Sequence, residues 1–224
     1  MMSKKCIPSN KGFVLTITGL MVMILLTLTK AVPSSTIAGY SVFVGIAFFF
    51  IVEGVDKTSG DESGLRFKSF AKDIKKPWVI PLTILPVFSA LATLVIGDFM
   101  FKGAFSTHVL GRSDSVLSFD RCVLLIFQVV LAAFGEEIAW RGFFLGKSMK
   151  IFPFWLSAIV SSALFSAGHI AAGSFGLVLY DIATIFIDSI IYAFIFKKSG
   201  NCLISTVSHI LCNATGIAVV LIFR

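Results

Sequence analysis

Residues 122–146 read CVLLIFQVVLAAFGEEIAWRGFFLG, and this stretch decides how the chain folds. It is long enough to cross a bilayer as one helix, since a span needs roughly 20 mostly apolar residues. It also carries Glu136, Glu137 and Arg141 within otherwise apolar sequence. Ionisable residues at membrane depth are costly and rare, and they mark functional sites by default. The stretch therefore predicts a membrane helix that holds part of a site.

The composition of the whole chain is that of a membrane protein. Of its 224 residues, 57% are hydrophobic and 14% are charged, whereas a soluble domain carries about 25% charged residues. The net charge of +7 is attributed to lysine and arginine in cytoplasmic loops, where they meet anionic lipid. No nucleic-acid partner is expected. The four cysteines show neither metal-ligand spacing nor a disulfide pattern, so we expect them to be reduced and structural.

Seven apolar stretches follow one another along the chain, and they predict an all-α fold. Residues 1–224 are expected to form one polytopic bundle of about seven to eight transmembrane helices. In the third stretch, Pro77, Pro81 and Pro86 predict a kinked helix, because an interior proline removes a backbone hydrogen bond. The stretches lie at about 13–29, 36–52, 77–97, 122–146, 153–172, 175–196 and 201–223.

Residues 63–76 predict one amphipathic helix that lies on the cytoplasmic face of the membrane. Phe67, Phe70 and Ile74 recur at helical spacing there, with lysine and arginine at most other positions. If successive spans alternate in direction, thirteen of the 19 basic residues share the side of the N-terminus, five lie on the other side, and Arg141 is buried. The positive-inside rule then places the N-terminus in the cytoplasm. The thirteen are Lys4, Lys5, Lys11, Lys57, Arg66, Lys68, Lys72, Lys75, Lys76, Lys147, Lys150, Lys197 and Lys198.

The polar residues of the later spans fall into pairs with different roles. Glu137 and Arg141 are four residues apart on one helix face, so we predict an ion pair between them. Glu136 lies about 100° around the helix from Glu137 and stays outside that pair. A free carboxylate in such a place is suited to accept a proton from water. His209 and Asn213, again four apart, point two polar groups at one place across the bundle.

A glutamate base, two histidines and an asparagine suit the hydrolysis of an amide. Glu136 and one histidine can activate water, while the other histidine and Asn213 can donate hydrogen bonds to the developing oxyanion. Asp181 and Asp188 share a face of the sixth stretch, and we interpret them as bonding to a neighbouring helix rather than lining a water path. His108 is interpreted as an ordinary loop residue.

Three motifs together resemble a known family. They are Glu136-Glu137-x-x-x-Arg141, Phe165-x-x-x-His169 and His209-x-x-x-Asn213. They resemble the signature of the CAAX-protease and bacteriocin-processing family, an intramembrane metalloprotease-like family also called Abi proteins, which includes the type II CAAX prenyl endopeptidases. The resemblance covers residues 122–216, the expected catalytic core.

The resemblance implies a role for each motif residue. Glu136 would activate water with help from His169, His209 and Asn213 would form the oxyanion hole, and Glu137 and Arg141 would support the site. It also implies about eight helices, with a short extra one around 98–121, and a site that opens toward the cytoplasm.

The sequence thus predicts an intramembrane glutamate-type endopeptidase with no cofactor and no metal. Its substrate would be a small peptide or a membrane-associated protein tail, in bacterial peptide maturation or bacteriocin self-immunity, and its location the bacterial plasma membrane. A non-catalytic scaffold or immunity protein of the same fold stays open. So do a proton-relaying transporter and a metalloprotease that uses Glu136, His169 and His209 as ligands.

Overall fold

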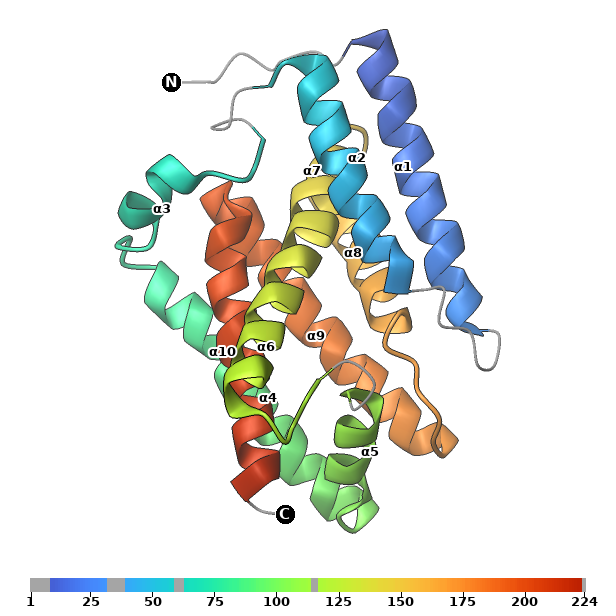
Figure 1. The fold of residues 1–224 in the computed structure, drawn as a ribbon, viewed down its shortest axis with the longest axis vertical. Helices are drawn as coiled ribbons and strands as arrows, with labels where there is room; N and C mark the ends of the chain where they lie inside the picture. The colour runs from blue at the N-terminus through green and yellow to red at the C-terminus, as the bar shows by residue number, and fades with distance from the viewer. Residues whose placement is uncertain (1–8, 32–38, 59–62, 114–116, 223–224) are drawn as a thin grey trace.

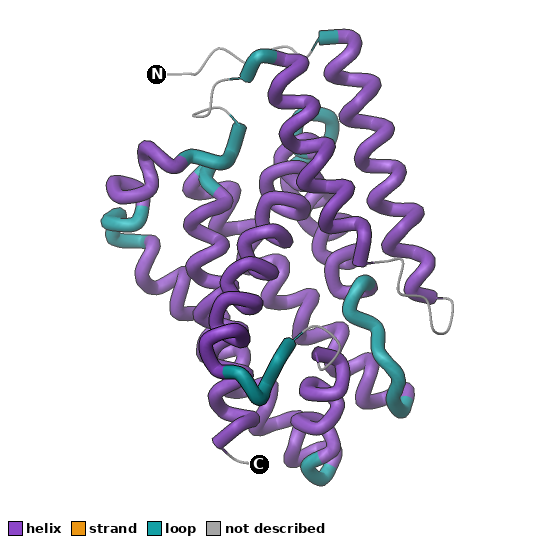
Figure 2. The backbone as a smooth tube through the Cα atoms, in the orientation of Figure 1, coloured by secondary structure: helices purple, strands orange, loops and turns teal. Residues whose placement is uncertain are grey.

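The computed structural model describes residues 9–31, 39–58, 63–113 and 117–222, and all regular structure in these parts is helical (Figures 1 and 2). Long helices run side by side along the long axis of the molecule, and the short helices α3 and α5 lie beside them. The helices are α1 (Asn10–Leu28), α2 (Tyr40–Asp56), α3 (Phe67–Asp73), α4 (Val79–Phe101), α5 (Ala104–Ser113), α6 (Cys122–Glu137), α7 (Gly146–Ser148), α8 (Phe154–Ala167), α9 (Phe175–Ser199) and α10 (Cys202–Ile222), with a 3-10 turn η1 (Thr29–Ala31) and a π-helical segment η3 (Ile138–Leu145).

Five described helices are long and apolar enough to cross a membrane. They are α1, α4, the continuous helix Cys122–Ser148 formed by α6, η3 and α7, and then α9 and α10. The surface of these helices also suits a membrane, because the side chains of Phe99 and Val123 are 87% and 84% exposed. Large apolar side chains on the outside of a bundle are stable against lipid tails but not in water. The chain therefore has the build of a multi-pass membrane protein.

All seven predicted apolar stretches are helical, but two are shorter than a full span. Helix α2 has 17 residues and α8 has 14, so the predicted count of seven to eight spans is not confirmed. The extra short helix expected around 98–121 is present as α5, whose 10 residues are too few to cross a bilayer. Helix α4 runs through Pro86 without a break.

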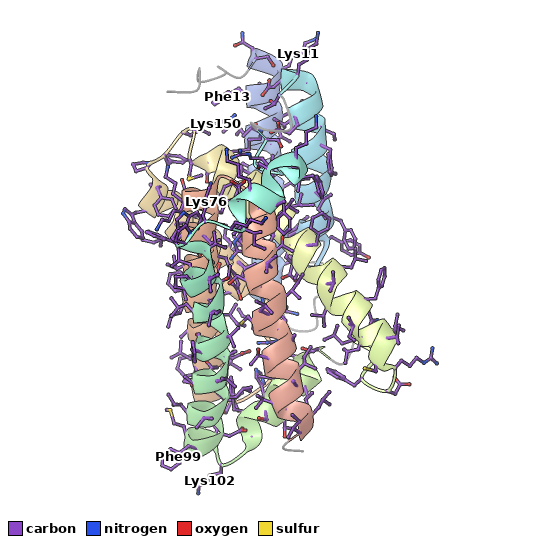
Figure 3. All side chains as sticks on the ribbon, turned by 90° about the vertical axis from the view of Figure 1, so that its left-hand side faces the viewer. Lys11, Phe13, Lys76, Phe99, Lys102 and Lys150 are labelled. Carbon is purple, nitrogen blue, oxygen red and sulfur yellow. The ribbon has the colours of Figure 1, made fainter. Side chains whose placement is uncertain are left out.

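The two ends of the bundle carry different side chains. Figure 3 places Lys11, Lys76 and Lys150 toward one end and Lys102 at the other. This separation agrees with the count of charges, which assigns Lys102 to the opposite side of the membrane from the other three.

Close helix contacts in the core depend on small residues. A side chain at Gly45 of α2 would bring its Cβ to 2.7 Å from the Cβ of Ala139 in η3. Only glycine allows these two backbones to approach so closely, which is how membrane helices gain van der Waals contact. The contact lies in the main core, where Phe49, Trp140 and Phe143 are buried.

Helix α3 is tied to the turn between α9 and α10 by a buried polar network. Asn201 is fully buried, and its amide nitrogen donates to the Arg66 carbonyl at 3.0 Å and to Asp73 Oδ2 at 3.4 Å. Asp73 also accepts from Ser69 at 2.7 Å and pairs with Lys76 at 2.8 Å. Burial disfavours the charged carboxylate, but these donors outweigh it and hold the pKa of Asp73 below its ordinary value. The amphipathic helix is therefore docked on the bundle as well as facing outward through Phe67.

Candidate active site

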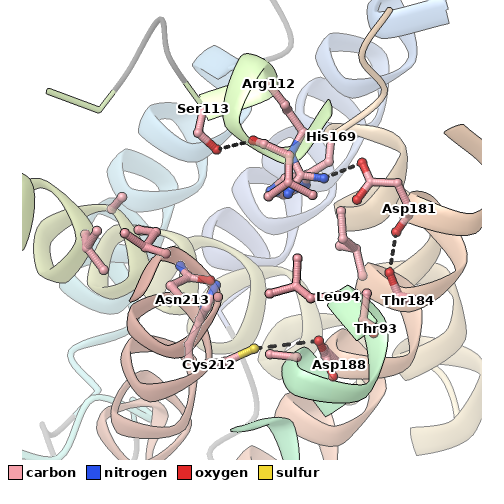
Figure 4. Close-up of a pocket in the computed structure, with 18 of the residues that line it drawn as sticks. Thr93, Leu94, Arg112, Ser113, His169, Asp181, Thr184, Asp188, Cys212 and Asn213 are labelled. Carbon is pink, nitrogen blue, oxygen red and sulfur yellow. Dashed lines mark hydrogen bonds and ion pairs between the residues drawn. The ribbon is translucent and has the colours of Figure 1, made fainter. Parts of the chain in front are cut away.

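The four residues predicted to be catalytic line one cavity of about 290 Å³. Glu136 lies at the end of α6, His169 just beyond α8, and His209 and Asn213 on α10. Their elements converge although up to 77 residues separate them in sequence, since Glu136 and Asn213 stand on helices that pack together. Figure 4 shows His169 and Asn213 facing this space from two sides. The sequence therefore identified residues that the fold brings together.

The adjacent carboxylates Glu136 and Glu137 have different surroundings. Glu137 is fully buried, and its Oε1 lies 2.9 Å from Nη1 of Arg141. The predicted ion pair is confirmed. The Glu136 side chain is 22% exposed and lines the cavity. One carboxylate is thus fixed by a cation behind the cavity wall, and the other is accessible from the cavity.

The helix changes type directly after the two glutamates. Ile138–Leu145 is a π-helical segment, and such segments are rare and often occur at functional sites. It carries Arg141 into the core, where Nη2 donates to the hydroxyl of Ser189 at 2.8 Å and to its carbonyl at 3.2 Å. The guanidinium carbon lies 4.8 Å from the Phe165 ring centroid and 5.1 Å from that of Tyr192. Arg141 therefore joins the η3 segment to α8 and α9.

His209 lies between the two carboxylates. Its Nδ1 is 3.0 Å from Glu137 Oε1, and its Nε2 is 3.6 Å from Glu136 Oε2. The sequence interpretation left Glu136 without any partner, because helical spacing reveals only partners on the same helix. Tyr192 stacks on the imidazole with ring centroids 4.7 Å apart and planes 21° apart. Tyr192 and Glu137 together fix the plane of the ring.

His169 stands in a turn, not inside a span. Helix α8 ends at Ala167, whereas the sequence placed residues up to 172 in the fifth apolar stretch. The early end follows from the turn formed by Gly168 and His169, whose amides bond to the Leu164 and Ser166 carbonyls. His169 Nδ1 is 2.8 Å from the Phe165 carbonyl, so Nδ1 is the donor and Nε2 is left for the cavity. Phe165 of the second motif thereby orients the histidine of that motif.

Helix α5 contributes polar residues that the sequence interpretation missed. His108, interpreted as an ordinary loop residue, lies in α5, and its Nε2 is 3.1 Å from Asp181 Oδ2. Arg112 bonds to the same carboxylate and lines the cavity. Asp181 thus does bond to a neighbouring helix, as interpreted, but both Asp181 and Asp188 also line the cavity. A buried aspartate in a membrane span requires charged or hydrogen-bonding partners. The position of Asp181 in the sixth stretch was therefore the sequence signal that could have predicted polar residues on a neighbouring helix such as α5.

The lining residues also show on which side the cavity lies. Phe105, Val109 and Arg112 of α5 line it, and α5 follows α4 at the end marked by Lys102. That end is opposite to Lys11 and Lys76 (Figure 3). With a cytoplasmic N-terminus, the cavity extends from mid-bundle toward the outer side. The residues that line the cavity therefore do not support the expectation of a site that opens to the cytoplasm.

The donor set does not fit a metal ion. A structural or catalytic zinc ion takes three or four converging nitrogen, sulfur or oxygen ligands. Within the described ranges, no group of three or more His, Cys, Asp or Glu residues is arranged to hold one. Glu136 and His209 approach each other, but His169 does not complete a triad with them.

The described helices thus form a multi-pass membrane protein that places a carboxylate, two histidines and an amide around one internal cavity. Residues 118–215 match the sequence model of a family described as type II CAAX prenyl endopeptidase, Rce1-like. The matched range contains all seven motif residues, and it confirms the resemblance found in the sequence. The family is a protease family, and the match supports a peptidase in a membrane setting. No curated protein sequence matches the chain.

Proposed function

We propose that the chain is an intramembrane endopeptidase that hydrolyses a peptide bond with water activated by Glu136. The observation that carries the proposal is the contrast between neighbouring carboxylates. Glu137 is committed to Arg141 and His209, whereas Glu136 reaches the cavity, where His209 Nε2 lies 3.6 Å from it and His169 lies close enough to feel its charge. A general base must be accessible to water, and Glu136, whose side chain is 22% exposed at the cavity, meets this condition.

His169 is proposed to help Glu136 position and deprotonate the water. Its Nδ1–H donates to the Phe165 carbonyl, so the lone pair of Nε2 is the available acceptor. A hydrogen bond from the water to Nε2 would aim the oxygen at the substrate carbonyl, and Glu136 would take the proton. Positioned proton acceptors contribute roughly 100- to 10,000-fold in rate.

His209 and Asn213 are proposed to bind the oxyanion. When protonated, His209 donates through Nδ1 to Glu137 and presents Nε2–H to the cavity. Asn213 lies one helical turn further along α10 and offers two amide donors to the same cavity. The charges then balance, because Arg141 and His209 offset Glu137 and Glu136. Such a preorganised donor pair stabilises charge that develops only in the transition state.

The reaction balances with these groups alone. The water oxygen bonds to the carbonyl carbon, its proton passes to Glu136, and the carbonyl oxygen becomes the oxyanion at His209 and Asn213. When the carbon–nitrogen bond breaks, Glu136 returns the proton to the leaving amine. The products are a carboxylic acid and an amine, which become a carboxylate and an ammonium after one proton passes between them, and the site regains its starting protonation state.

The substrate is proposed to be a small peptide or a membrane-associated protein tail, in bacterial peptide maturation or in self-immunity to bacteriocins. A cavity of about 290 Å³ inside the bundle accommodates a short extended segment rather than a folded domain. Glu136→Gln is the direct test, because it keeps the shape and removes the base. Comparison of protein termini between cells with wild-type protein and cells with this variant should reveal cleavage products in the first only. Identical termini at equal protein levels would favour the non-catalytic scaffold.

A further inference from the structure

The cavity contains one acid that the proposed reaction does not use. Asp188 lines the wall formed by α9, and its Oδ1 is buried without a hydrogen-bond partner. Its other contacts are weak for a carboxylate, namely the Cys212 thiol at 3.7 Å (Figure 4) and the Ser89 hydroxyl. Neither donor carries a charge, and the nearest imidazole, that of His209, faces Glu136 and Glu137 and acts on Asp188 only at longer range.

The other acids of the cavity have cationic or imidazole partners. Asp181 binds Arg112 and His108, and Glu136 has His209 beside it. Across the described residues, no ion pair involves Asp188. An ionised carboxylate buried without a cation is unfavourable by several kcal/mol, so such a group holds a proton unless a cation binds beside it. A bound cation would remove that cost.

We propose that Asp188 forms a substrate subsite that selects a basic residue, lysine or arginine, next to the scissile bond. The position favours such a ligand, because Ala90 and Leu94 of α4 line the same cavity and can cover the methylene groups of a long basic side chain. The charged head would then meet the carboxylate at the end of an apolar wall. The inference rests on the proposed function for the statement that a peptide occupies this cavity.

The first experiment measures specificity. Wild-type protein in nanodiscs is incubated with an equimolar mixture of apolar peptides that differ only by Lys, Arg, Gln or Leu at each position, and the cleaved bonds are identified by mass spectrometry. We expect basic residues to be enriched at one position beside the cleaved bond. The enrichment should vanish in Asp188→Asn and persist in Asp120→Asn, a matched change of an exposed acid. Equal cleavage of Lys and Gln peptides by the wild type would overturn the subsite.

The second experiment does not require turnover. Butylguanidinium and its neutral isostere butylurea are titrated against the Glu136→Gln variant in nanodiscs, with thermal unfolding as the readout. Butylguanidinium should stabilise this protein, and the additional Asp188→Asn change should weaken its binding roughly 10- to 100-fold, the range for a hydrogen bond to a charged group. Equal effects of both probes, or binding that survives Asp188→Asn, would overturn the subsite. If no peptide is cleaved, the proposed function fails while this titration still decides the subsite.

Discussion

His209 Nδ1 lies 3.0 Å from Oε1 of Glu137, the same oxygen that Arg141 approaches to 2.9 Å. Glu137 therefore has two tasks, whereas the sequence analysis predicted only its ion pair with Arg141. It compensates a buried guanidinium, and it sets the orientation of the imidazole across the cavity wall. A residue expected only to support the site is in direct contact with the group proposed to bind the oxyanion.

Glu137 and His209 should act as one unit in catalysis. We expect Glu137→Gln and His209→Gln each to lower kcat by about 100-fold or more, as loss of an oxyanion donor does. The double variant should be no worse than the slower single variant, because removal of one partner already disables the other. Single-turnover rates of the four proteins test this. Additive losses would mean that the two residues act separately.

The buried ion pair of Arg141 should contribute more to stability than an exposed ion pair of the same kind. It is 1% exposed, and Arg141→Met would leave fully buried Glu137 without its cation. Breaking a buried pair in this way costs about 3–5 kcal/mol in the free energy of unfolding. Arg121→Met is the matched control, because Arg121 is 72% exposed beside Asp120 and its pair should contribute about 0–1 kcal/mol. Reversible unfolding in mixed micelles measures both. Equal free energies for the two variants would contradict a structural role for the Arg141 pair.

Docking of α3 should depend on pH through Asp73. The folded-state pKa of Asp73 lies below the ordinary value of about 3.9. A depressed pKa means that the carboxylate stabilises the fold above the ordinary value, and that this contribution is lost as pH falls below it. Nitroxide labels at Lys68 and Lys197 should therefore show a wider distance distribution at pH 3 than at pH 6.

The Asp73→Asn variant provides the internal check on this pH effect. It should show the wide distribution already at pH 6 and little further change on acidification. A wild-type distribution that does not change between the two pH values would mean that Asp73 does not hold α3.

The sequence predicted the helices and the polar residues that line the cavity for one physical reason. Apolar length identifies spans, and an ionisable residue inside a span must be functional or paired, which led directly to Glu136, His169 and His209. What it could not predict were contacts between helices, such as His209 with Glu137 or His108 with Asp181, because the period of one helix contains no information on its neighbours. The π-helical segment after Glu137 was also missed, since Ile138–Leu145 has ordinary helix-forming residues and its geometry comes from packing.

Catalysis should need no metal. Glu136 and His209 are 3.6 Å apart, and the described residues supply no third ligand to this pair. Elemental analysis of purified protein should find no stoichiometric zinc, and chelators should leave the cleavage rate unchanged. One equivalent of zinc that is lost together with activity, and that restores activity on return, would favour the metalloprotease alternative.

Asn213 should contribute to the transition state and little to substrate binding. It lines the cavity one turn from His209, and an amide donor aimed at the oxyanion acts only when negative charge develops there. Asn213→Ala should lower kcat about 100- to 1000-fold, or roughly 3–4 kcal/mol, with KM nearly unchanged. Thr215→Val is the control on the same helix, since the exposed Thr215 hydroxyl bonds to the Leu211 carbonyl of its own helix. Asn213→Asp is the sharper change, because it keeps the volume but turns an acceptor toward the oxyanion, and it should be at least as slow as Asn213→Ala. Near-normal kcat in Asn213→Asp would show that Asn213 is not an oxyanion donor, and the oxyanion would then depend on His209 alone.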